Sequence, residues 1–377
     1  MKINKILILA SAAFLGACQV ITPTKNVDAP LDLSQTLNFD SNVEVGELEN
    51  GLSYYIAENL NPESRVYVRL VVNAGSMSED DDQRGVAHIV EHMAFNGTKH
   101  YPGNEVIKVL EEAGMKFGVD INAFTDFENT VYTLNLPSND PETLELVMDV
   151  LSDWASNVTM LKGDLDAERG IVLEEWRARL GPMLRLGDKK SAIEMAGSRY
   201  VMRDPIGDPH TIKNVSKYRV ADFYTKWYRP DNMSVVVVGD VQTEQIKQLI
   251  TRKLGDAKAP DSPLETVDYS IPLVEGWRSE VVSEEGYSSP SVEVSFFSTF
   301  QPDLSYARYQ EDLAHQIATR LLNVRLQRWE QDEDNVVNAA NFYSSNVGRE
   351  TSQAVFSLQL VEGQYEQATQ GLFQFIA

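Results

Sequence analysis

Strand-like and helix-like hydrophobic patterns follow one another along the first 260 residues of the chain. Residues 66–72 are rich in β-forming apolar side chains and end at Asn73-Ala74-Gly75, which predicts a strand. Residues 85–95 carry apolar positions at helical spacing and end at Asn96-Gly97, which predicts a helix and its stop. The same patterns predict further elements: helices at 104–113, 142–154, 165–180 (with Asp164 as N-cap), 220–227 and 243–254, a hairpin or long strand at 123–136, and a strand at 234–238.

A similar order of elements restarts after a proline-containing segment. The pattern predicts a strand at 292–297, a helix at 306–329, a strand at 354–360 and a helix from about 363 onward. We therefore expect an α+β fold of repeated α/β units, each with a mixed, largely antiparallel sheet flanked by helices, and a second unit that is cut short. The expected domains are 44–260, a linker at 261–272, and an incomplete second domain at 273–377.

The first residues have the pattern of a targeting segment. Lys2 and Lys5 precede the apolar run 6–14, which is too short to span a bilayer. The run ends in Leu15-Gly16-Ala17-Cys18, which resembles the lipobox of bacterial lipoproteins. We expect a signal peptide at 1–17, lipid attachment to Cys18, and a polar tether at 18–43. An ordinary signal peptide or a short buried helix is the alternative.

Composition narrows the possible functions. The 377 residues are 43% hydrophobic and 24% charged, as in folded globular proteins. The net charge of -23 repels phosphate backbones, so we expect no nucleic-acid partner. The only cysteine is Cys18, so its lipidation would leave no thiolate for a metal site and no disulfide.

The predicted helix at 85–95 carries the pattern His88-x-x-Glu91-His92. Residues four apart share a helix face, so both imidazoles can point at one metal ion. Glu91 lies on the same side and is suited to take a proton from a water molecule that zinc has acidified. This order of residues occurs in zinc peptidases. A surface helix with two solvated histidines is the alternative.

A catalytic zinc usually has three protein ligands, so this pattern is one ligand short. A carboxylate on a second helix is the natural donor, and the predicted helix at 165–180 offers Glu168, Glu174 and Glu175. Glu168 and Glu175 are two turns apart and share a face, whereas Glu174 is turned by about 100°. Each of the three could equally be a solvated helical glutamate.

With these motifs the sequence resembles the pitrilysin and insulinase family of zinc metallopeptidases, which includes the mitochondrial processing peptidases. The resemblance covers about 44–255 and continues more weakly to 377. It implies His88, His92 and Glu175 as ligands of one Zn²⁺ per catalytic domain. It further implies Glu91 as the catalytic base and Glu168 as an accessory acidic residue of the catalytic site. It also implies the fold of LuxS and the mitochondrial processing peptidases, with paired halves that enclose a peptide.

The resemblance also suggests where a substrate would bind. Asn122, Ala123 and Phe124, followed by Thr125, resemble the segment beside an edge strand that pairs with the peptide. Phe95, three residues after His92, matches an aromatic residue of the cleft. Without the family, Phe95 and Phe124 would be taken as core residues.

The leading hypothesis is a zinc-dependent endopeptidase or oligopeptidase that cleaves unfolded peptides. The lipobox resemblance predicts a lipid-anchored protein of a Gram-negative-type cell envelope, on the outer membrane facing the periplasm. A missing C-terminal half or a partner subunit would complete the chamber. The alternatives are a non-catalytic peptide-binding or partner subunit, and a metal-dependent hydrolase of non-peptide substrates.

Overall fold

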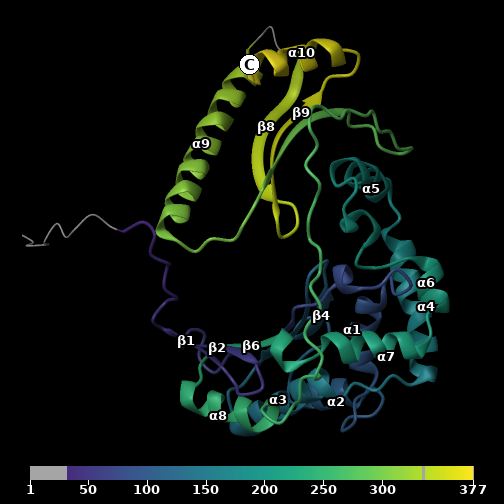
Figure 1. The fold of residues 1–377 in the computed structure, drawn as a ribbon, viewed down its shortest axis with the longest axis vertical. Helices are drawn as coiled ribbons and strands as arrows, with labels where there is room; N and C mark the ends of the chain where they lie inside the picture. The colour runs from purple at the N-terminus through teal and green to yellow at the C-terminus, as the bar shows by residue number, and fades with distance from the viewer. Residues whose placement is uncertain (1–31, 333–335, 377) are drawn as a thin grey trace, which may run out of the picture.

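The computed structural model describes residues 32–332 and 336–376, which form two α/β units (Figure 1). The first unit contains a six-stranded sheet in the order β1-β2-β6-β3-β5-β4. Only β2 and β6 pair in parallel, and all other neighbours are antiparallel. The strands are β1 (Val43–Glu47), β2 (Ser53–Glu58), β3 (Val66–Val72), β4 (Ile121–Thr125), β5 (Thr130–Leu136) and β6 (Met233–Gly239).

Alternation along the central strands buries one face of this sheet. In β3, Val66, Val68, Leu70 and Val72 are completely buried, while Tyr67 between them is exposed. Helices pack on the buried side, and α1 contacts β4 and β5. The helices of this unit are α1 (Val86–Asn96), α2 (Glu105–Glu112), α3 (Pro141–Ser156), α6 (Pro209–Asn214), α7 (Lys217–Trp227) and α8 (Thr243–Leu254).

The second unit repeats part of this topology. Its three-stranded sheet has the order β7-β9-β8 and is antiparallel throughout. The chain runs from strand to helix, to hairpin, to helix, as it does from β3 through α1 and α2 and the β4–β5 hairpin to α3. Its elements are β7 (Ser291–Thr299), α9 (Tyr306–Glu330), β8 (Val337–Asn346), β9 (Thr351–Leu360) and α10 (Tyr365–Ile376). The expected fold class, repeated α/β units with largely antiparallel sheets flanked by helices, is confirmed, although only the first sheet is mixed.

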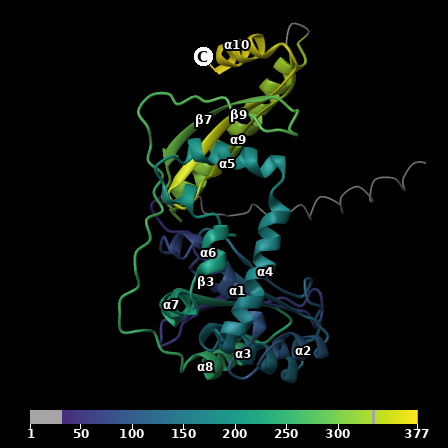
Figure 2. The ribbon, with the colours of Figure 1, turned by 90° about the vertical axis from the view of Figure 1, so that its right-hand side faces the viewer.

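Two segments connect the units. Helices α4 (Lys162–Arg179) and α5 (Pro182–Glu194) lead from the first unit to the second sheet, and Figure 2 shows α5 beside β7 and β9. Lys190 on α5 pairs there with Glu293 on β7. A long stretch without helix or strand, from 255 to 290, follows α8. The domain boundaries expected at 260 and 272 fall inside this stretch and remain predictions.

The hydrophobic pattern missed several elements and misplaced the starts of α4, α7 and β9, each of which begins three residues earlier than expected. Helix α4 begins at Lys162 after Leu161, so the expectation that Asp164 caps it is wrong. Residues 123–136 form the β4–β5 hairpin, with β4 beginning at Ile121. The elements β1, β2, β8, α5 and α6 were not expected.

The expected signal peptide, Cys18 and most of the expected tether lie outside the described residues. The last part of that tether contacts the second unit: the amides of Tyr306 and Ala307 donate to the carbonyls of Gln35 and Leu33. In the described part of the chain, no helix has the length and apolar character needed to cross a membrane.

Candidate metal centre

Helices α1 and α4 pack against each other and bring three potential metal ligands together. His88 and His92 follow one another on one face of α1, and their Nε2 atoms lie 3.2 Å apart. Oε2 of Glu175, on α4, lies 3.7 Å from Nε2 of His88 and 3.6 Å from Nε2 of His92. All three ligand atoms thus lie within 4.8 Å of one another.

This arrangement fits a tetrahedral zinc ion. Donor atoms bound to zinc at about 2.0–2.2 Å lie roughly 3.4 Å from one another around a tetrahedron, close to the spacing of His88, His92 and Glu175. Two imidazoles and one carboxylate are also a usual donor set for a catalytic zinc with one open position. Glu174, another of the carboxylates considered for the third ligand, instead pairs with Arg177 on the surface of α4.

Burial keeps His88 neutral, and a carboxylate orients the ring of His92. Burial, together with the positive charges of His92 and Arg179, lowers the pKa of His88 to about 3, so its ring is neutral at neutral pH. Its buried Nδ1 has no hydrogen-bond partner among the described residues. Nδ1 of His92 lies 2.8 Å from Oε2 of Glu168, which leaves Nε2 of His92 free to face His88.

Glu168 therefore lies behind His92 rather than beside an open metal position. It is 6% exposed, and burial opposes its charged form, but hydrogen bonds from His92 and Asn96 and the charge of His92 together lower the pKa of Glu168. Burial opposes the charged form of His92, but Glu168 and the neighbouring carboxylates raise the pKa of His92. A carboxylate that holds the second nitrogen of a ligating histidine fixes both ring orientation and tautomer. This contact makes Glu168 a positioning residue.

Glu91 lies beside the two histidines and is nearly buried, with 7% exposure. Burial raises the pKa of Glu91, while a hydrogen bond from the Thr125 hydroxyl, 2.6 Å from Oε2, opposes this rise. Thr125 was not among the expected site residues. Its place directly after Asn122-Ala123-Phe124 was the only signal in the sequence.

Glu79 is a second residue that sequence reasoning missed. It is fully buried, and its Oε1 accepts hydrogen bonds from the backbone amides of Gly85 and Ala87 at the start of α1. Glu79 thus anchors the first turn of the helix that carries His88. Burial raises the pKa of Glu79 to about 8. The only sequence signal for this role was the run of acidic residues just before the helix expected at 85–95.

The expected substrate-binding residues lie along β4 and at the end of α1. Strand β4 is at an edge of the sheet and pairs only with β5 among the described strands. Asn122 and Phe124 on β4 are exposed, and Ala123 between them is half-buried. Phe95 is partly buried, with its ring 5.3 Å from Trp154 and 5.8 Å from the exposed Phe117. Phe95 is thus both a core contact and a neighbour of the exposed aromatic surface.

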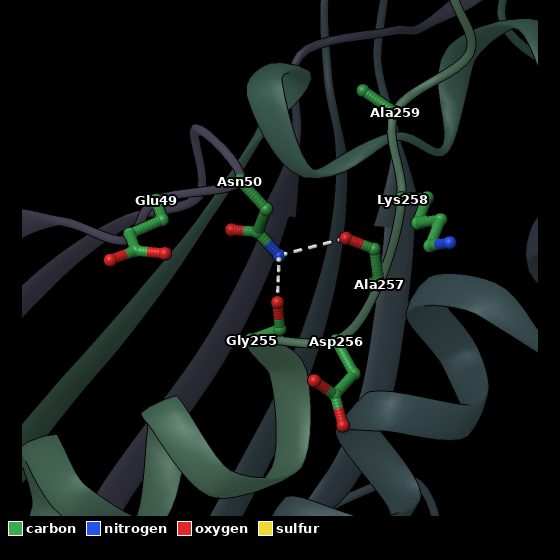
Figure 3. A pocket seen from close by; sticks show the side chains of 7 residues that line it. All are labelled: Glu49, Asn50, Gly255, Asp256, Ala257, Lys258 and Ala259. Carbon is green, nitrogen blue, oxygen red and sulfur yellow. Dashed lines mark hydrogen bonds between the residues drawn. The ribbon is translucent and has the colours of Figure 1, made fainter.

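A surface pocket lies at the opposite edge of the sheet from β4, beside the segment that follows β1 (Figure 3). Its lining does not include a comparable group of potential metal ligands. The side-chain amide of Asn50 donates there to the carbonyls of Leu254, Gly255 and Ala257. This amide satisfies the free carbonyls at the C-terminal end of α8. We therefore attribute the polar contacts in this pocket to capping of α8.

Comparison with known proteins places this geometry in a family. Residues 54–180 match the model "Insulinase (Peptidase family M16)", and residues 214–377 match "Peptidase M16 inactive domain". The crystal structure of the first half of the periplasmic protease PqqL from Escherichia coli is 30% identical, covers 89% of this chain and 71% of that chain, and gives a TM-score of 0.83. The chain belongs to the insulinase family, peptidase family M16.

Within the family, the chain is similar to curated PqqL proteins. The "Probable zinc protease PqqL" of Haemophilus influenzae is 55% identical over 96% of this chain, and its Escherichia coli namesake is 39% identical over 60%. The chain spans 38% and 24% of the lengths of these two relatives. A pitrilysin crystal structure, with 19% identity and a TM-score of 0.71, shares the fold.

Proposed function

We propose that this chain provides the zinc site of a metallopeptidase that hydrolyses peptide bonds in unfolded peptides. The observation that carries the proposal is the convergence of His88, His92 and Glu175 beside the buried carboxylate of Glu91. The PqqL relatives are named as probable zinc proteases, and these names support both the metal and the type of reaction.

The residues of the chain have distinct tasks in this proposal. Bound zinc would act as a Lewis acid toward the peptide carbonyl and a water molecule. Glu91 would accept the proton of the attacking water and deliver it to the departing amine. Thr125 holds one carboxylate oxygen of Glu91, so the other oxygen is left for this proton transfer. Glu168 keeps His92 in the tautomer whose Nε2 can bind the metal.

Strand β4 would hold the substrate. An extended peptide can add to a free sheet edge through backbone hydrogen bonds, and this mode of binding favours chains that lack their own fold. The exposed ring of Phe124 and the pair Phe95–Phe117 lie where they could contact the side chains of such a peptide. Asn122 and Ala123 complete this proposed binding edge.

We also propose that the protein works in the cell envelope of a Gram-negative-type bacterium. The similar first half of a protease from Escherichia coli is described as periplasmic. The lipobox-like segment ending at Cys18 supports anchoring by lipid to the outer membrane, facing the periplasm. Completion of a closed chamber by further chain or by a partner subunit is part of the same proposal.

Replacement of the base separates catalysis from metal binding. Glu91→Gln keeps the size of the side chain and the acceptor for Thr125 but removes the base. We expect one zinc per chain to be retained and cleavage of unstructured reporter peptides to fall by about 10²–10⁴-fold. Glu111→Gln, at an exposed position of α2, is the matched control and should cleave like the wild type. Undiminished cleavage by Glu91→Gln would reject the assigned base.

The same assay distinguishes the proposed peptidase from a non-catalytic subunit. A wild-type protein that binds zinc and peptide but cleaves no peptide in the reporter set would support the non-catalytic peptide-binding subunit. The second unit, which matches a domain described as inactive, is the part of the chain that favours this alternative. Among the described residues, the only cluster of potential metal ligands is the one in the first unit.

A further inference from the structure

The hairpins of the two units meet at their tips. The β4–β5 hairpin turns at 126–129, and the β8–β9 hairpin turns at 347–350. Both hairpins have the same place in the topology of their units, after the helical segment that follows β3 or β7. Arg349, in the second turn, donates from Nε to Oε2 of Glu128 in the first turn, over 2.9 Å.

Tyr200, on the short helix Arg199–Met202, joins both turns. Its hydroxyl donates to Oε1 of Glu128 at 2.9 Å and accepts from the backbone amide of Arg349 at 3.2 Å. Tyr200 is 3% exposed, so this hydroxyl is held in a packed cluster that includes Tyr269. The guanidinium of Arg349 lies 4.5 Å from the centre of the Tyr269 ring. We call Glu128, Tyr200, Tyr269 and Arg349 the tip contact.

The backbone at the tip contact leaves no room for a side chain at position 348. Gly348 has a φ of 70°, and a Cβ atom at this position would lie 2.4 Å from the hydroxyl oxygen of Tyr200. Only glycine therefore lets the β8–β9 turn approach Tyr200 this closely. The close fit shows that the second hairpin is seated on the first unit by shape as well as by charge.

A short path leads from Glu128 to Glu91. The carboxylate of Asp126 accepts from the amides of Glu128 and Asn129, so the first turn is itself rigid. The carbonyl of Asp126 also accepts from the amide of Ser76 at 3.1 Å. The neighbouring residue, Thr125, ends β4 and donates to Glu91 at 2.6 Å.

We propose that the tip contact positions β4 and Glu91, so that the second unit supports peptide cleavage although it supplies no ligand to the metal cluster. Glu128, Tyr200 and Arg349 are then positioning residues. Their effect passes through the turn at 126–129 to both the proposed peptide-binding edge and the catalytic base. This inference rests on the proposed peptidase function for its kinetic test but not for its structural test.

The structural test measures hydrogen exchange of the backbone amides at 121–130 in the full chain. Arg349→Met removes the charge and keeps an unbranched side chain, and Glu128→Gln removes the acceptor charge from the other side. Each variant should exchange these amides at least about tenfold faster than the wild type. Exchange at wild-type rates in both variants would overturn the proposal.

The chain offers a matched control in the same unit. Arg308 pairs with Asp312 at 3.0 Å and lies 5.2 Å from the ring of Phe300, so it combines an ion pair and an aromatic contact as Arg349 does. Arg308→Met should leave exchange at 121–130 unchanged. If Arg349→Met does not fold, Tyr200→Phe, which removes only the hydroxyl, provides the same comparison.

The kinetic test uses reporter peptides and zinc-loaded protein. Arg349→Met should lower kcat/KM by about tenfold or more, because small displacements of catalytic groups are costly, and zinc content should remain that of the wild type. Arg349→Lys should restore part of the activity. Wild-type kcat/KM in Arg349→Met would contradict the inference. A wild type that cleaves no peptide would instead reject the proposed function and leave the exchange test to decide.

Discussion

Glu168 lies 2.8 Å from Nδ1 of His92, on the side of the ring opposite the nitrogen that faces His88. The two helices of the metal centre are therefore joined twice, once through Glu168 and once through Glu175. The inner contact is buried, while the Glu175 side chain is 43% exposed. The site thus has a fixed interior side and an open side for substrate.

The contact between Glu168 and His92 predicts a role in metal affinity. Glu168→Gln would keep the packing but weaken the hold on Nδ1–H of His92. Loss of such a partner typically costs about 10–100-fold in metal affinity. Competition with a chromogenic chelator measures the zinc Kd. Glu174→Gln, on the outer surface of the same helix, should bind zinc like the wild type, and an equal loss in both variants would contradict the assignment.

Thr125 is predicted to set the pH range in which Glu91 is ionised. Its hydrogen bond lowers the pKa of Glu91 against the effect of burial, so Thr125→Val should raise that pKa. Because the base must be deprotonated, the acidic limb of the kcat/KM profile should move to higher pH. Activity at pH 6 should fall by about tenfold or more. Thr125→Ser should restore the wild-type profile, and an unshifted limb in Thr125→Val would argue against this role.

The buried carboxyl of Glu79 predicts how stability changes with pH. Its pKa is about 8 in the folded protein against an ordinary value of 4.5, so the folded state holds the extra proton between these values. Stability must then fall as pH rises through this window, by at most about 1.4 kcal/mol per pH unit.

Urea unfolding of the wild type and Glu79→Gln from pH 5 to 8 isolates this contribution. The glutamine variant lacks the titrating group, so its stability relative to the wild type should grow as pH rises. Other groups contribute equally to both proteins and cancel in the difference. A difference that does not change with pH would show that Glu79 does not titrate in this range.

Zinc binding is predicted to stabilise the folded chain. A ligand that binds only the folded state adds about 4 kcal/mol when its concentration is 1,000 times its Kd. Thermal unfolding should therefore occur at a lower temperature after chelation and recover when zinc is restored. His88→Ala should lose this response, while His315→Ala, at an exposed position of α9, should keep it. An identical zinc response in all three proteins would place the metal elsewhere.

The sequence predicted the structure correctly where the signal lay within one short segment of the chain. Helix α1 was expected at 85–95 and occupies Val86–Asn96, because regular apolar spacing and the following glycine define it. The common face of His88 and His92 followed from helix geometry alone. Strand β8 gave no such signal, since most of its side chains are polar or exposed and backbone pairing with β9 defines it.

Long-range contacts could not be predicted from local patterns. Nothing in the spacing of Glu168, Glu174 and Glu175 shows which one faces α1, and the family resemblance was needed to favour Glu175. The contact of Thr125 with Glu91 joins a strand to a helix 34 residues earlier. The anchoring of α1 by Glu79 likewise depends on burial, which an acidic residue in a polar segment does not reveal.

Metal content of the purified chain tests the central claim most directly. Elemental analysis after zinc loading and dialysis should give about one zinc per chain for the wild type and Glu174→Ala, and far less for Glu175→Ala. This result would assign the third ligand to the carboxylate that faces His88 and His92. Full zinc retention by Glu175→Ala, or its loss in Glu174→Ala alone, would contradict the account.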